Sequence, residues 1–177
     1  MSFMDLTLKR ESCRNFADKK VEKQDLVSCI EAARHSPSAC NSQPWHFTVV
    51  NDPALSPKVA QCTQNLGMNK FTNQCPAFIV VCQESANATA KIGGVITNQQ
   101  FAPIDIGIAV SHICYRATEL CLSICILGWF NPKRVKTLLK LPKNKRVRLI
   151  LAVGYANSEK IRTKTRKSLD EIMTYMG

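Results

Sequence analysis

Apolar residues along this chain recur with two different periods, and segments of the two kinds alternate. A return every three or four positions predicts an amphipathic helix, whereas a short continuous apolar run predicts a buried strand. The clearest helical pattern covers residues 103–121, where proline stands at the first position. Its apolar positions are Ile106, Val110, Ile113, Ala117 and Leu120.

Weaker patterns predict further helices before and after this one. A short helix is expected over 3–10, and an amphipathic one over 23–35 with Leu26, Ile30 and Ala33 on one face. Three more segments have helical spacing or helix-capping residues. They are 55–66, 132–139, which opens with Asn131-Pro132, and 168–176, where Ser168 is the expected N-cap.

Apolar runs predict strands at 47–50, 78–82 and 147–155. Residues 124–130 fit either a buried strand or a loop. Residues 84–102 lack periodicity and contain Gly93-Gly94, which favours a mobile loop or a short helix. Strands that alternate with helices indicate a mixed α/β chain, with residues 1–177 forming one domain around a small sheet.

Nine cysteines, an odd number with no Cys-x-x-Cys pair, argue against a disulfide framework, and no signal peptide is evident. We therefore expect a reducing, cytoplasmic environment. Cys114, Cys121 and Cys125 have nearly helical spacing, which predicts core positions rather than ligands. The cysteine spacings and the scattered histidines fit no common metal site. No apolar run approaches the length of a membrane span.

Positive charge is concentrated near the C-terminus. Residues 1–130 carry 11 Lys and Arg against 10 Asp and Glu, whereas residues 131–177 carry 13 against 3. Such a patch indicates an anionic partner or a solvated face. Helix-turn-helix, zinc-finger and aromatic RNA-binding motifs are absent from the sequence, so no nucleic-acid partner is predicted.

Two segments carry the chemistry. The first is Lys9-Arg10-Glu11-Ser12-Cys13-Arg14, and the second runs from His35 to Phe47 and contains Pro-Ser-x-x-Asn-x-Gln-Pro-Trp. Together they resemble the opening signatures of the nitroreductase family of flavin mononucleotide (FMN) oxidoreductases, and the resemblance extends from Leu8 to Ile172. It implies an α+β fold with a small, central, mostly antiparallel sheet surrounded by helices. It also implies a homodimer with active sites at the subunit interface.

The resemblance assigns a phosphate site to both ends of the chain. Arg10 and Arg14 flank Ser12, and guanidinium groups match phosphate geometry bidentately. A second basic element, Lys164-Thr165-Arg166, is similar to the C-terminal phosphate element of the family. We therefore expect Arg10, Ser12, Arg14, Lys164 and Arg166 to bind the FMN phosphate.

The resemblance also assigns residues to the flavin ring. In the family, the Pro-Ser loop covers the flavin of the other subunit, which implies cofactor contacts for Pro37, Ser38, Ala39, Asn41 and Gln43. Trp45 is more simply a core residue.

Two further elements are assigned to the ring by resemblance. They supply Leu127 and Gly128 after an apolar run, and Asn69 and Lys70 before the second strand. The chain departs from the family pattern at Glu11, Cys121, Ser123 and Trp129.

These features imply an NAD(P)H-dependent FMN oxidoreductase that reduces an electron-poor acceptor such as a nitroaromatic or a quinone. Neither a Gly-x-Gly-x-x-Gly motif nor a P-loop is present, so donor and acceptor are expected to share one cleft in ping-pong turnover. The flavin carries the chemistry, so no catalytic acid or base and no metal are assigned. Two alternatives remain: a flavin-binding or basic interaction protein without turnover, and a flavin-modifying enzyme of the same fold. A deiodinase-like enzyme is not favoured. Residues 84–103 contain no Tyr for a deiodinase-type lid.

Overall fold

Four strands form one antiparallel sheet in the order β1-β2-β4-β3 in the computed structural model, which describes residues 1–158 and 160–177. The N-terminal segment adds to its outer edge, because Ser12 forms a parallel bridge with Ile124 and the Cys13 N–H donates to the Ile124 carbonyl at 3.1 Å. The expected mostly antiparallel sheet is confirmed. The strands are β1 (Trp45–Val50), β2 (Ala77–Gln83), β3 (Ser123–Leu127) and β4 (Arg146–Gly154).

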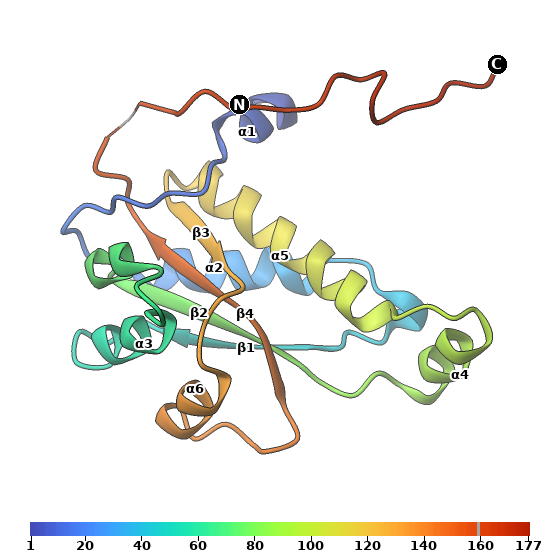
Figure 1. Cartoon of the computed structure of the whole chain (residues 1–177), viewed down its shortest axis with the longest axis horizontal. Coiled ribbons are helices and arrows are strands. Elements are labelled where there is room, and N and C mark those ends of the chain that lie inside the picture. Colours follow the sequence, from blue (N-terminus) through green and yellow to red (C-terminus); the bar gives the residue numbers. More distant parts are fainter. Residues whose placement is uncertain (159) are drawn as a thin grey trace.

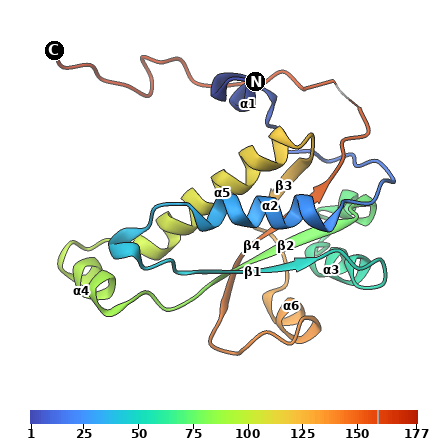
Figure 2. The same cartoon turned by 180° about the vertical axis from the view of Figure 1, so that it is seen from behind.

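Helices cover both faces of the sheet, as Figures 1 and 2 show from opposite sides. Side chains alternate along a strand, so Ile79 and Val81 pack toward α2 (Lys23–Arg34) and α5 (Phe101–Glu119). Phe78 and Val80 pack in the opposite core, under the helices α3 (Ser56–Thr63) and α6 (Pro132–Leu138). The two remaining helices are α1 (Phe3–Lys9) and α4 (Ala88–Ile96).

Most predicted elements are present with small shifts at their ends. The helices expected over 3–10, 23–35, 103–121 and 132–139 are α1, α2, α5 and α6, while the helix expected over 55–66 is shorter. Residues 84–102 contain α4, which begins where the Asn87 side chain accepts a hydrogen bond from the Ala90 N–H at 2.9 Å. Residues 123–127 are a strand rather than a loop.

The prediction of a helix over 168–176 is wrong. This part of the chain has only a turn near residues 169–172 and otherwise extends away from the body of the molecule. The Ser168 hydroxyl and N–H both donate to the Glu171 carboxylate, but no helix follows. A short helix is marginal in water without tertiary packing, and this one has no surface to pack on. Its apolar side chains stay exposed: Leu169, Ile172, Met173, Tyr175 and Met176.

All nine cysteines are free thiols, and seven of them are buried. Burial raises the pKa of Cys29 and Cys75 to about 12 and that of Cys114 to about 11. The predicted core positions of Cys114 and Cys125 are confirmed, whereas the prediction for Cys121 is wrong. Cys121 is exposed in a left-handed turn, with φ of 60°, where α5 ends before β3.

Within the described residues, no cluster of three or more His, Cys, Asp or Glu side chains is arranged to hold a metal ion. No helix in that same part of the chain is both long and apolar enough to cross a membrane.

Candidate functional site

The segment after α1 and the segment after β4 lie side by side and enclose a cavity of about 260 Å³. Residues about 150 positions apart in the sequence therefore face one space. All five side chains assigned to the phosphate by resemblance line it, together with Glu11, Arg162 and two threonines. The lining residues are Arg10, Glu11, Ser12, Arg14, Arg162, Thr163, Lys164, Thr165 and Arg166.

Arg162 fixes the segment after β4 to the segment after α1 through three hydrogen bonds. The Glu11 carboxylate accepts hydrogen bonds from the Arg162 guanidinium and from the Arg162 backbone N–H, both at 3.3 Å. A further guanidinium nitrogen of Arg162 donates to the Ser12 carbonyl at 2.6 Å. Glu11, one of the positions at which the chain departs from the family pattern, thus holds the C-terminal segment in place.

Lys164 is bound to the end of α1. Its ammonium donates to the Thr7 carbonyl at 3.0 Å and also to the Leu8 carbonyl. The last carbonyls of a helix have no partner within the helix and carry partial negative charge, which favours a cation there. Burial lowers the pKa of Lys164, and the neighbouring charges of Arg10 and Arg166 lower it further.

Among the described residues that line the cavity, the guanidinium groups of Arg10, Arg14 and Arg166 form no ion pair. Each makes at most a local contact: Arg14 donates to the Ser12 carbonyl at 3.5 Å and Arg166 to the Thr165 carbonyl at 2.7 Å. The described lining contains five cations, which repel each other, and one carboxylate, that of Glu11, which offsets only part of this charge. An anion with several acceptor oxygens relieves the repulsion, so the donor set suits a phosphate monoester such as that of FMN.

The sequence analysis did not assign Arg162 to the phosphate site, although the sequence contains a signal for it. Arg162, Lys164 and Arg166 alternate along the chain, and side chains two apart in an extended segment point to the same side. The alternation extends the Lys-x-Arg element by one residue.

The loop between α2 and β1 has an unusual backbone. Cys40, Asn41 and Gln43 have φ values of 50°, 49° and 46°, a left-handed conformation that is unfavourable for residues other than glycine. Local hydrogen bonds stabilise it. The Ser38 hydroxyl accepts from the Gln43 N–H at 3.0 Å, and the Gln43 amide donates to the Asn41 side chain at 3.0 Å.

Two residues outside the loop form hydrogen bonds with it, Asp105 of α5 and Asn87 at the start of α4. The Asp105 carboxylate of α5 accepts a hydrogen bond from the Ala39 N–H at 3.2 Å and is only 4% exposed. Asn87, the cap of α4, donates to the Cys40 carbonyl and to the Ser42 hydroxyl, both at 3.0 Å. The sequence analysis assigned neither Asp105 nor Asn87 to the site. The signal for Asp105 was a charged residue between Ile104 and Ile106, within the apolar pattern of α5.

The loop lies near the start of α5, whereas α1, which leads into the basic cavity, lies near the other end of α5 (Figures 1 and 2). The loop contacts Asp105, whereas α1 packs on Tyr115 through Phe3, with ring centroids 5.0 Å apart. Ten residues of helix separate the two contacts, which corresponds to about 15 Å. The loop is therefore not part of the lining of the basic cavity in the same chain.

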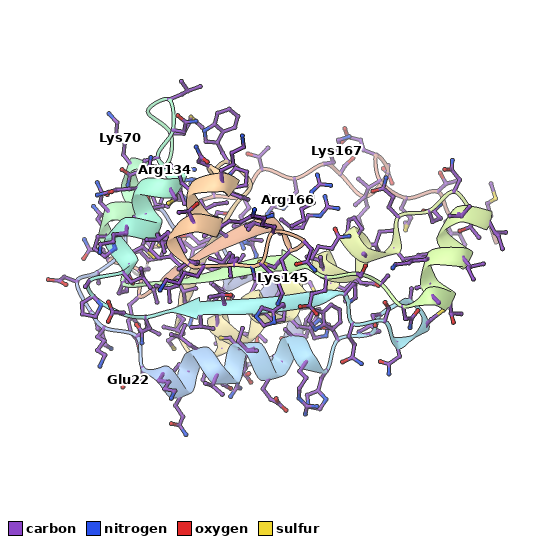
Figure 3. All side chains as sticks on the ribbon, turned by 90° about the horizontal axis from the view of Figure 1, so that it is seen from below. Glu22, Lys70, Arg134, Lys145, Arg166 and Lys167 are labelled. Carbon is purple, nitrogen blue, oxygen red and sulfur yellow. The ribbon has the colours of Figure 1, made fainter. Side chains whose placement is uncertain are left out.

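The remaining predicted residues are scattered. The Asn69 amide donates to the Trp129 carbonyl at 3.1 Å, which ties it to the segment after β3. A side chain added at Gly128 would meet open space, whereas Leu127 is buried in the core. Lys70 lies well apart from Arg166 in Figure 3.

Comparisons with known proteins agree with this architecture. The profile of the Nitroreductase family matches residues 7–155. An oxygen-insensitive NADPH nitroreductase of Helicobacter pylori is 27% identical, over 99% of this chain and 100% of its own length. Iodotyrosine deiodinases also occur among the similar proteins, at lower identity.

Two solved structures extend the likeness to three dimensions. A nitroreductase family protein of Clostridium difficile 630 is 31% identical with a TM-score of 0.79, and the match covers 99% of this chain and 98% of that one. An FMN-dependent nitroreductase of Clostridium difficile R20291 is 26% identical with a TM-score of 0.72, over 95% and 94%.

The expectation of an NAD(P)H-dependent oxidoreductase is confirmed at the level of the enzyme class, because relatives that match 85–99% of the chain are named as NADPH or NAD(P)H nitroreductases. With the family profile covering most of the residues and the same fold in solved members, the chain belongs to the nitroreductase family.

Proposed function

We propose that this protein binds FMN in the basic cavity and transfers a hydride from NAD(P)H to an electron-poor acceptor such as a nitroaromatic or a quinone. The observation that carries the proposal is the convergence of Arg10, Ser12, Arg14, Lys164 and Arg166 on one cavity. The FMN-dependent relative of known structure supports the choice of cofactor.

The roles of the residues follow from their positions. Arg10, Arg14 and Arg166 bind the phosphate oxygens, Ser12 adds a hydroxyl donor, and Lys164 holds α1 against the site. Gly128 leaves room beside the ring. The flavin, when bound, supplies the hydride chemistry, so the protein needs no catalytic acid, base or metal.

A homodimer completes the site in this proposal. The loop of residues 37–43 does not line the basic cavity of its own chain, and following the family resemblance we assign it to the flavin held by the partner. The distribution of apolar side chains supports this assembly, because α1 exposes Phe3, Met4 and Leu8 at 63–64% and the start of α5 exposes Ile104 at 52%. A group of exposed apolar side chains such as that on α1 marks a protein interface. Nine free thiols favour a reducing compartment, for which we propose the cytoplasm.

Removing the Asp105 carboxylate is expected to weaken FMN binding although Asp105 is far from the basic cavity. Asp105→Ala leaves the Ala39 N–H without its acceptor, and a hydrogen bond to a charged group contributes about 1.5–3 kcal/mol. We expect the dissociation constant for FMN, measured by flavin fluorescence, to rise about tenfold or more. Asp105→Asn keeps an acceptor oxygen and should retain most of the affinity. Equal affinities for FMN in wild type and Asp105→Ala would show that the loop does not serve the cofactor.

Steady-state kinetics test the proposed reaction. Because the sequence contains no dinucleotide-binding motif, donor and acceptor should occupy one cleft in turn. Initial rates with NADH or NADPH against a nitroaromatic or a quinone should give parallel double-reciprocal lines. Intersecting lines would reveal a ternary complex and hence a separate nicotinamide site.

Other activities of the fold have weaker support. A deiodinase-type lid requires Glu, Tyr and Lys, but residues 84–103 contain no Tyr. Glu84 is moreover paired with Lys145 at 2.7 Å. A flavin-binding protein without turnover, or a flavin-modifying enzyme, is separated from the proposed oxidoreductase by the same kinetic assay.

A further inference from the structure

A second cavity, of about 730 Å³, lies at the end of the molecule that carries α4. Its size is within the range of small-molecule sites. The walls come from α4, from the start of α5 and from the ends of β2 and β4 that pair with each other.

Arg148 is held in a fixed orientation in the wall of this cavity. The register between β2 and β4 shifts at Val81 and Cys82, so Arg148 falls between the paired residues Val147 and Leu149. Its Nε donates to the Gln83 side-chain oxygen at 2.6 Å. One edge of the guanidinium is thus bound, and the terminal nitrogens are available for a ligand.

No carboxylate neutralises this guanidinium within the described residues. The cavity lining contains no Asp or Glu, and Arg148 takes part in none of the ion pairs in that part of the chain. Burial lowers the pKa of Arg148, and the adjacent charge of Arg146 adds to the effect. A partly buried cation without a counter-ion is unfavourable, and an anionic ligand relieves it.

The rest of the lining defines the shape of that ligand. Lys91 brings a second positive charge from α4, while Phe101, Ala90 and Val95 give an apolar wall. Amide side chains of Asn98, Gln99 and Gln100 add neutral polar groups. A flat apolar ring that carries one carboxylate satisfies both halves of the cavity.

We propose that this cavity is a binding site for small aromatic carboxylates, with Arg148 as the residue that binds the carboxylate. The site adjoins the loop of residues 37–43, because Asn87 at the start of α4 donates to Cys40 and Ser42. If that loop covers a flavin, the bound carboxylate lies near the reaction centre and belongs to the electron acceptor. This second statement rests on the proposed function, whereas the binding site does not.

Direct binding of benzoate to the purified protein, measured by calorimetry or ligand-observed NMR, tests the site. Benzamide has nearly the same shape without the charge, and we expect it to bind about tenfold or more weakly, since a charge-assisted hydrogen bond is lost. Arg148→Gln should remove this preference. Arg146→Gln, which makes the same charge change at a neighbouring exposed residue outside the cavity, should keep it. Lys91→Gln, on the exposed side of α4, should weaken benzoate severalfold even if Arg148→Gln does not fold.

Equal binding of benzoate and benzamide, or a benzoate affinity that Arg148→Gln and Lys91→Gln leave unchanged, would overturn the proposal. So would stronger Arg148-dependent binding of adenosine monophosphate, which would make the ligand a nucleotide. The role in turnover has its own measurement: the ratio of kcat/KM for para-nitrobenzoate over para-nitrobenzamide should fall about tenfold in Arg148→Gln. Benzoate binding that depends on Arg148 in a protein without reductase activity would retain the site and reject the proposed function.

Discussion

Arg10→Ala is expected to purify as a colourless protein that regains a yellow colour only with excess FMN. Arg10 lines the basic cavity, and none of the described contacts there compensates for its loss. Truncating one partner of a buried, hydrogen-bonded charge pair costs about 2–4 kcal/mol, which corresponds to an affinity loss of about 30-fold to 1,000-fold. The measurement is the flavin content after gel filtration, followed by titration with FMN.

A neighbouring lysine provides the matched control. Lys9→Ala removes the same charge one residue earlier, from the exposed last turn of α1, and does not change the lining of the basic cavity. This variant should remain yellow. If Arg10→Ala retains as much flavin as Lys9→Ala, the phosphate site is misassigned.

A charge placed on the exposed face of α5 is expected to remove both the dimer and the flavin. Ile104 is 52% exposed in the single chain, and Ile104→Glu buries an unpaired carboxylate if this face meets a partner. Since the loop of one subunit is assigned to the flavin of the other, a monomer should not retain FMN. Light scattering and the flavin absorbance of the same sample report both effects.

Two further variants separate assembly from cofactor binding. Val27→Glu introduces the same charge at a similarly exposed position, 55%, on α2, and should change neither property. Asn41→Ala should weaken FMN binding while the dimer persists, because the Asn41 side chain contacts Gln43 within the loop. A flavin-loaded monomer of the wild type or of Ile104→Glu would rule out the shared site.

The sequence predicts those elements whose formation depends on local patterns. The spacing of Ile106, Val110 and Ile113 identifies α5, and continuous apolar runs identify β2 and β4, which are buried on both faces. The helix expected over 168–176 fails for the opposite reason. Its pattern of apolar residues is real, but a helix there needs a surface on which to pack, and these residues remain exposed.

The candidate site is predictable only in part. Nothing in the spacing of Arg10 or Lys164 places them together, and only the family resemblance joined the two ends of the chain. Asp105 and Arg162 were missed because their importance lies in contacts with distant residues, Ala39 and Glu11. Local sequence patterns mark both residues as unusual but do not identify the distant residues that they contact. The left-handed backbone at Cys40 and Asn41 was equally hidden, since neither residue is glycine.

The most direct test is the colour of the purified wild-type protein during anaerobic addition of NADH or NADPH. We expect a yellow protein whose flavin absorbance is lost on addition of the reduced nicotinamide and restored by a nitroaromatic or a quinone. The restored spectrum should match the starting one, because the cofactor stays bound throughout. A flavin absorbance that persists in excess NADH and NADPH, or a protein that takes up no FMN at all, would contradict the proposed function.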